Sequence, residues 1–128
     1  MRYLLDTHTF LWWCAAEPKL SVDATTVISN SENVIYVSAV SAWEIAIKSR
    51  LGKLPLPSKP DDFMSKMLQR HAFSVLEISM KHTLAEYYLP IHHHDPFDRL
   101  LIAQASLENM TLISNDKLIT KYQITTLW

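Results

Sequence analysis

The stretch HHHDPFDRLLIAQASLENMTLISND, from His92 to Asp116, holds the pattern on which the fold prediction rests. Its central part, FDRLLIAQASLEN, has apolar residues at helical spacing, and TLIS directly after it has the composition of a short buried strand. Asp95 and Pro96 stand where a helix N-cap and a first helical residue are favoured. The stretch is therefore predicted to be a helix followed by a strand, with acidic residues at both ends.

The same alternation continues along the rest of the chain. YLLD (3–6) and VIYVS (34–38) are apolar runs of strand length, and a segment with helical spacing follows each of them. SVLEI (74–78) and ITTLW (124–128) read as further strands. Apolar strands separated by helices are typical of a parallel sheet that is covered on both faces. The sequence predicts an α/β fold in which one parallel β-sheet, flanked by helices, forms a single domain over residues 1–128.

Composition excludes several classes of protein. The 128 residues are 48% hydrophobic and 20% charged, and the net charge of −1 gives no overall attraction to nucleic acid or to an anionic membrane. Cys14 is the single cysteine, which excludes an internal disulfide and fits a reducing cytoplasm. No apolar run reaches membrane-spanning length. The single glycine excludes a dinucleotide fingerprint and a phosphate-binding P-loop. A cytoplasmic protein without membrane contact is expected.

Five acidic residues follow strands or open helices in this reading. In a parallel sheet, right-handed crossovers bring the carboxyl ends of the strands to one edge, where ligands bind. The acids are thus expected at the same edge of the sheet. They are Asp6, Glu44, Asp95, Asp98 and Asp116.

Two interpretations of these acids compete. Singly, each fits a structural role, since Asp favours N-caps and Ser41-x-x-Glu44 matches a capping box. Together, converging carboxylates repel one another unless a cation or protonation relieves them. Carboxylate oxygens are suitable ligands for Mg²⁺ or Mn²⁺. Such an ion would activate a water molecule for attack on a phosphodiester, which favours a metal-dependent nuclease.

Four segments carry a resemblance to a known family. LLDTHTFLW, VSAVSAWEIAIKSRLGKLPLP, HDPFDRLLIAQA and LISND occur in the order and spacing of the PIN-domain family, and are most similar to its VapC-type ribonuclease toxins. The resemblance runs from Tyr3 to about Asp116 and departs from many relatives at His8, where they have Asn. It implies an endoribonuclease that uses Mg²⁺ or Mn²⁺, a cognate antitoxin and a homodimer. The implied catalytic and metal-binding residues are Asp6, Glu44, Asp98 and Asp116, with Thr7, Ser38, Asp95 and Asn115 in support.

Basic residues are concentrated in one part of the chain. Six of the twelve Lys and Arg residues fall between positions 48 and 70. A solvated face is the plain explanation. The alternative is a rim that guides the RNA backbone, with Lys48, Arg50 and Lys53 as its RNA-binding residues.

The histidines leave several possibilities open. His92 and His94, with Asp95, could imitate a zinc site, or their loop could touch RNA or a partner, or it could simply be solvated. His71 and His82 are expected on helix surfaces.

Two other functions are compatible with the fold. A non-catalytic PIN-like module could bind RNA or protein without cleavage. A phosphatase with an aspartate nucleophile would share Asp6, but such enzymes typically have a second Asp two residues later, where this chain has His8.

Overall fold

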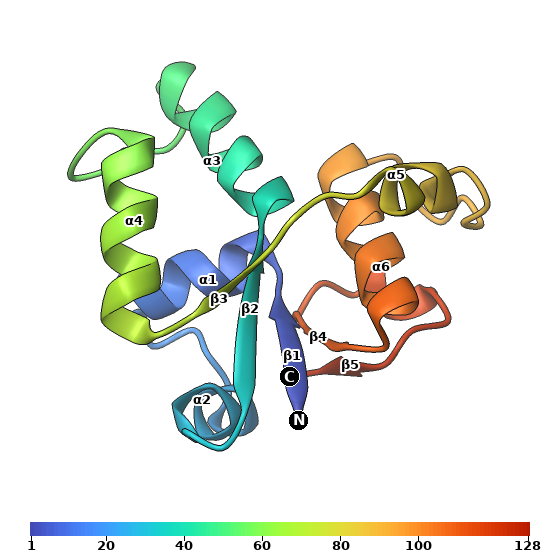
Figure 1. Ribbon diagram of the computed structural model, residues 1–128, viewed down its shortest axis with the longest axis horizontal. Coiled ribbons are helices and arrows are strands. Elements are labelled where there is room, and N and C mark those ends of the chain that lie inside the picture. Colours follow the sequence, from blue (N-terminus) through green and yellow to red (C-terminus); the bar gives the residue numbers. More distant parts are fainter.

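A computed structural model describes all residues, 1–128, and contains one sheet of five parallel strands in the order β3-β2-β1-β4-β5 (Figure 1). The predicted α/β fold with a parallel sheet is confirmed. The strands are β1 (Arg2–Leu5), β2 (Val34–Ser38), β3 (Ser74–Leu76), β4 (Thr111–Ile113) and β5 (Thr126–Leu127). The helices are α1 (Thr7–Cys14), α2 (Val22–Ser29), α3 (Ala39–Arg50), α4 (Pro60–His71), α5 (Met80–Glu86) and α6 (Pro96–Glu108), and a short 3-10 turn, η1, spans Ile119–Lys121.

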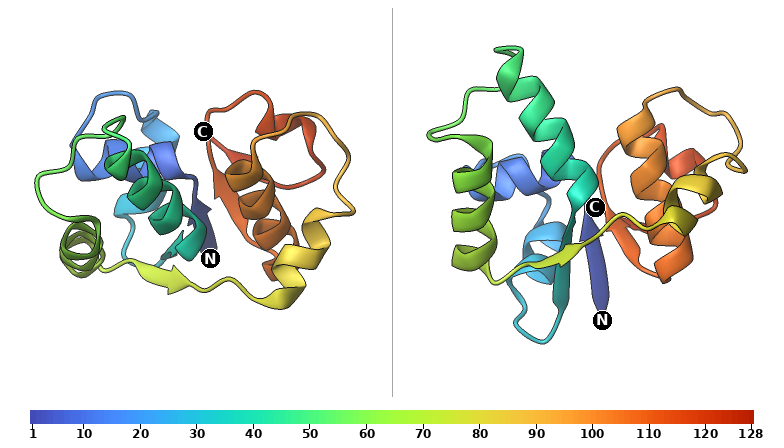
Figure 2. Two further views of the ribbon diagram at one scale, coloured as in Figure 1. Left: turned by 90° about the horizontal axis from the view of Figure 1, so that it is seen from above. Right: turned by 45° about the horizontal axis from the view of Figure 1, so that its top comes forward.

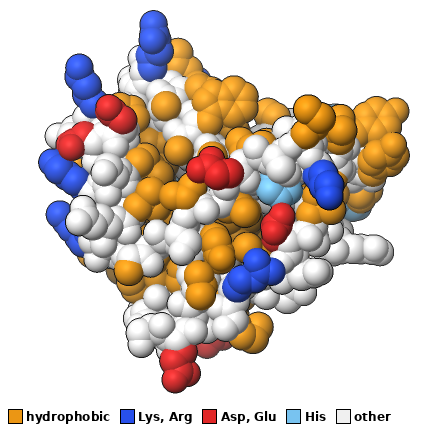
Figure 3. Space-filling view, in the orientation of Figure 1, with side chains coloured by type: hydrophobic (Ala, Val, Ile, Leu, Met, Phe, Trp, Pro, Cys, Tyr) orange, Lys and Arg blue, Asp and Glu red, His pale blue; other side chains and the backbone are white.

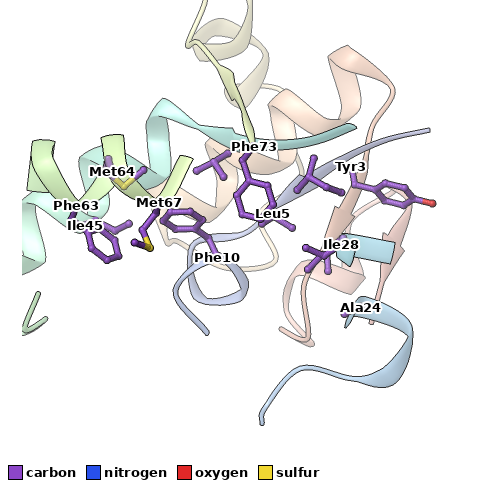
Figure 4. Packing of buried hydrophobic residues seen from close by; sticks show 13 residues of the cluster. Tyr3, Leu5, Phe10, Ala24, Ile28, Ile45, Phe63, Met64, Met67 and Phe73 are labelled. Carbon is purple, nitrogen blue, oxygen red and sulfur yellow. The ribbon is translucent and has the colours of Figure 1, made fainter. Parts of the chain in front are cut away.

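Alternate residues of the central strands enter two separate cores. Tyr3 and Leu5 of β1 pack with α1, α2 and α4 on one face, whereas Leu4 packs with α6 on the other. Side chains of a strand alternate between the faces of its sheet, so strands buried on both sides need continuous apolar sequence. Figure 2 shows the two groups of helices on opposite sides of the strands, and Figure 4 shows Phe10 packed among residues of the first core.

Helix starts follow the predicted capping residues with one exception. Asp6 caps α1 by accepting a hydrogen bond from the backbone N–H of Thr9, and Asp95 caps α6. The predicted capping box at Ser41 is wrong, because Ser38 caps α3 and Ser41 lies inside the helix. The chain enters α3 directly from β2, which moves the N-cap three residues earlier than the sequence pattern suggests.

The expected surface position of His82 is also wrong. This side chain is buried where α5 packs on α6, and its ring contacts Glu108 through Nε2 at 2.9 Å. His71 is half-buried and accepts a hydrogen bond from the indole of Trp13. The polar partners of His82 compensate the cost of burying its ring, whereas Nε2 of His71 is buried without a hydrogen-bond partner. None of the helices combines the length and the apolar character that a membrane span requires.

Candidate active site

The carboxyl edge of the sheet brings together acids that lie far apart in the sequence. Asp6 follows β1, and Asp116 lies three residues after the end of β4. Since α6 leads back into the parallel strand β4, its N-terminus starts at this same edge and carries Asp98 in its first turn (Figure 1). The charges of Asp6 and Asp116 both act on Asp98, so the three aspartates lie within electrostatic reach of one another.

Asp6 is held rigidly at the start of α1. Its side chain is buried, and its Oδ1 accepts the N–H of Thr9 at 2.8 Å. Burial raises the pKa of this carboxyl group above its ordinary value, and hydrogen bonds from Ser114 and Thr9 oppose the shift. The carboxylate therefore occupies a costly position that α1 and β4 together keep fixed.

Asp98 carries a second perturbed carboxyl group. Burial, the neighbouring charge of Asp95 and smaller effects from Asp116 and Asp6 together raise its pKa to about 6. A hydrogen bond with His93 opposes these effects. A carboxyl group that is disfavoured as an anion by several other carboxylates is typical of a site that binds a cation or exchanges a proton.

Glu44 lines a cavity with Thr7 and His8, the two residues that follow Asp6, and has a basic partner. It lies in the second turn of α3, buried, and its Oε2 pairs with Lys48 at 2.5 Å. Its Oε1 is buried without any hydrogen-bond partner. A buried carboxylate oxygen with no partner costs free energy, so this atom is available to a ligand.

The residues expected to support the acids take different positions. Thr7 donates a hydrogen bond to Ser41 at 2.9 Å, which ties the start of α1 to α3 near Glu44. Ser38 caps α3 and contacts the side chain of Gln104, 2.5 Å away. Asp95 caps α6 beside Asp98. Asn115 is exposed at the strand end.

Ser114 is a residue that the sequence analysis missed. It is buried, it hydrogen-bonds to Asp6, and its hydroxyl oxygen accepts the backbone N–H of Asp116 at 3.1 Å. This one hydroxyl therefore links two of the acids. Its position directly after a buried strand was the signal available in the sequence, but the same signal applies to many serines.

The three predicted RNA-binding residues do not share one surface. Lys48 and Lys53 line a cavity of about 280 Å³ together with Thr7, His8 and Glu44. Arg50 borders a different hollow next to Trp43 and Pro60. Figure 3 shows Lys and Arg side chains along the margin over α3 and α4, with others on the opposite half of the same face.

The acidic edge has donor atoms of the kind that Mg²⁺ and Mn²⁺ bind. Its donors are carboxylate oxygens, which these ions prefer, and the unpartnered Oε1 of Glu44 points to a missing ligand. As they stand, no three acidic, histidine or cysteine side chains are grouped closely enough to hold an ion. The donor chemistry and the mutual repulsion at Asp98 fit a divalent cation.

Comparison with protein families matches residues 3–124 to the PIN domain. The chain belongs to the PIN-domain family. The match covers both cores and the complete acidic edge, in agreement with the resemblance that the four sequence segments carry.

Two curated proteins of Mycobacterium tuberculosis are similar to this PIN domain. Ribonuclease VapC16 is 39% identical over 70 residues, and the match covers 52% of the chain but only 50% of that protein. Ribonuclease VapC22 is 25% identical over 123 residues, covering 94% of the chain and 91% of that protein.

Solved structures share the fold of this PIN domain at low sequence identity. VapBC2 from Rickettsia felis, bound to a DNA fragment from its promoter, has a TM-score of 0.72 at 18% identity. The match covers 99% of this chain and 98% of the VapBC2 chain. VapBC-1 from nontypeable Haemophilus influenzae has a TM-score of 0.64 at 19% identity, and the match covers 99% of this chain and 97% of the VapBC-1 chain. At these identities the likeness concerns the fold.

Proposed function

We propose that this PIN domain is a metal-dependent endoribonuclease and the toxin of a type II toxin–antitoxin pair. The observation that carries the proposal is the acidic edge, where three aspartates act on one another and Glu44 has a buried, unpartnered oxygen. Two curated relatives are the ribonucleases VapC16 and VapC22, which supports RNA as the substrate. We propose further that residues 1–128 act as one nuclease domain in the cytoplasm.

The proposed reaction is hydrolysis of an RNA phosphodiester. Asp6, Glu44, Asp98 and Asp116 would hold Mg²⁺ or Mn²⁺, which supplies Lewis-acid polarisation and a nucleophilic water when bound. Thr9 and Ser114 keep the carboxylate of Asp6 in place during the reaction. Because its pKa is about 6, the carboxyl group of Asp98 is mostly protonated below about pH 6 and ionised above it, where it can hold a cation.

The basic residues near the site have different proposed roles. Lys48 is paired with Glu44 and holds this side chain in its buried position. Lys53 lines the adjacent cavity without an acidic partner and would meet an RNA phosphate there. Arg50 would contact RNA only where the strand extends past Trp43.

The cleavage experiment uses labelled RNA with MnCl2 or MgCl2 and the purified full chain. Asp6→Asn and Asp116→Asn should lower the rate by more than about 100-fold, since each removes a charge that holds the ion. Glu32→Gln removes one negative charge from an exposed turn and serves as the matched control. Excess EDTA should abolish cleavage. Full activity of Asp6→Asn, or cleavage in EDTA, would refute the proposal; tight RNA binding without cleavage would instead favour a binding module.

A groove that would accept an antitoxin segment lies next to the cavity at Glu44. A mostly apolar cavity of about 480 Å³ lies between α1 and α4, lined by Leu11, Trp12, Leu56 and Phe63 among others. His8 also lines the smaller cavity at Glu44, so the two hollows are neighbours. We propose that an antitoxin segment packs apolar side chains here and extends a basic one to the acids. The structural neighbours VapBC2 and VapBC-1 support a protein partner of this kind.

Two measurements test the proposed partners. Co-expression with the short protein encoded next to this chain should yield a stable complex and suppress cleavage, whereas Trp12→Glu should weaken it. If cells express the chain alone without a growth defect, and the chain does not bind the protein encoded next to it, the toxin role is contradicted. The proposed homodimer should appear in light scattering as twice the mass of 14.8 kDa.

A further inference from the structure

His93 is the buried member of the triple-histidine segment. Its side chain is 9% exposed, whereas His92 and His94 are exposed at the surface. Its Nδ1 lies 2.8 Å from the hydroxyl of Tyr122, and its Nε2 lies 3.3 Å from Oδ2 of Asp98. Both ring nitrogens thus have partners, and one partner belongs to the acidic site.

The direction of these hydrogen bonds follows from the two ends of the chain, because Arg99 can only donate and the ionised carboxylate of Asp98 can only accept. Nη1 of Arg99 donates to the hydroxyl oxygen of Tyr122 at 3.0 Å, and a guanidinium group has no acceptor. The proton of Tyr122 is therefore free to be donated onward to Nδ1 of His93. A neutral imidazole that accepts at Nδ1 carries its proton on Nε2, which faces Asp98. The bonds form a directed chain from Arg99 through Tyr122 and His93 to the carboxylate.

The start of this chain is firmly anchored. Arg99 is buried, and it also donates to the carboxylate of Glu86 at 2.7 Å and to the backbone carbonyl of Pro90 at 2.9 Å. Tyr122 is buried as well and lies beyond η1, near the end of the chain. Arg99 therefore holds the end of α5 and the C-terminal segment against α6. Tyr122 is fixed by its bond to Arg99, and it holds the ring of His93 at Nδ1.

The same contacts exclude His93 as a metal ligand. Its Nδ1 lone pair receives the proton of Tyr122, and its Nε2 carries a proton, so no lone pair of the neutral ring is free. The ring of His93 therefore cannot add a ligand to a histidine zinc site in this arrangement.

We propose that His93 is a positioning residue that orients the carboxylate of Asp98 for the cation, with Tyr122 and Arg99 holding the ring in its Nε2–H form. The inference rests on the proposed nuclease function, because it concerns the working orientation of one of the proposed metal-binding carboxylates. At 3.3 Å the bond to Asp98 is longer than the usual 2.9–3.0 Å, so it contributes little to the stability of the fold, and its expected effect is on the orientation of the carboxylate. Groups that orient metal-binding side chains typically contribute about 10–100-fold to metal affinity or activity.

The first test measures the tautomer of the His93 ring directly and needs no RNA. In ¹⁵N-labelled, metal-free protein at pH 7.5, long-range ¹H–¹⁵N spectra should show His93 as the neutral Nε2–H tautomer. Mn²⁺ titration by calorimetry should give an affinity about 10-fold weaker for His93→Ala than for the wild type. A neutral Nδ1–H ring, or an unchanged Mn²⁺ affinity, would overturn the inference.

The second test compares RNA cleavage at limiting MnCl2. His93→Ala should cut about 10–100-fold more slowly and need more Mn²⁺ for its half-maximal rate. His93→Gln keeps an N–H donor that can reach Asp98, and should recover part of the loss. Tyr122→Phe should change both quantities in the same direction by less.

The matched control is His92→Ala. The ring of His92 packs edge-on against Tyr122 at 4.8 Å between ring centroids but has no contact with Asp98. It should cleave like the wild type; an equal loss in His92→Ala and His93→Ala would assign the segment to RNA contact and overturn the positioning role. If His93→Ala fails to fold, His93→Gln and Tyr122→Phe decide. A wild type that cuts no RNA would refute the proposed function, while the tautomer and Mn²⁺ affinity still decide the role of His93.

Discussion

Replacing Asp98 by Asn should stabilise the metal-free protein, and the gain should depend on pH. Folding raises the pKa of this carboxyl group from 3.8 to about 6, mainly through burial and the charge of Asp95. The folded state therefore loses stability as the pH rises from 3.8 through about 6, and the cost is absent at lower pH. Asn has nearly the same volume, has no charge, and can still accept the hydrogen bond from His93.

The magnitude follows from the same values. A shift from 3.8 to about 6 costs the folded state about 3 kcal/mol at pH 8 and about half of that at pH 5. The side chain of Asp98 is 20% exposed, and the carboxylates share the effect, so the observable gain is reduced to roughly 1–2 kcal/mol. For a chain of this length this corresponds to a rise in Tm of roughly 4–8 °C.

The assay is thermal unfolding followed by circular dichroism in EDTA, at intervals between pH 5 and pH 8. Glu32→Gln controls for the loss of one negative charge, because this residue lies exposed in a turn. Asp98→Asn should gain more at pH 8 than at pH 5, and Glu32→Gln should change little at either. A gain in Tm of equal size at both pH values, or no gain at pH 8, would refute the explanation that burial and neighbouring charges destabilise the ionised carboxylate of Asp98.

Three further predictions concern stability and reactivity. Arg99→Met should lower the free energy of unfolding by about 3–5 kcal/mol in urea titrations, since it leaves the partly buried carboxylate of Glu86 without its partner; a loss below 1 kcal/mol would contradict the anchoring role. Asp95→Ala should cost about 1 kcal/mol through loss of the α6 N-cap, whereas Asp95→Asn, which can still cap, should cost much less. Burial raises the pKa of Cys14 to about 12, so at pH 8 iodoacetamide should label it slowly in the folded protein and rapidly in urea; equal rates would disprove its burial.

The sequence by itself determined the class of fold and most helix starts. Apolar runs such as YLLD and VIYVS predicted strands, and Asp95-Pro96 predicted the start of α6, because periodicity and capping are local properties of the chain. It also predicted that the acids follow strand ends, from which the topology of a parallel sheet brings Asp6, Asp98 and Asp116 together.

Only the tertiary structure decided which side chains meet. It made Ser38 the cap of α3 in place of Ser41, buried His82, and gave Ser114 its place between Asp6 and Asp116. Such contacts depend on how elements pack across the fold, which no local pattern specifies. The contact of His93 with Tyr122 spans 29 positions of the chain. The triple histidine therefore resembled a metal site in sequence, whereas packing directs one of its rings to orient an acid.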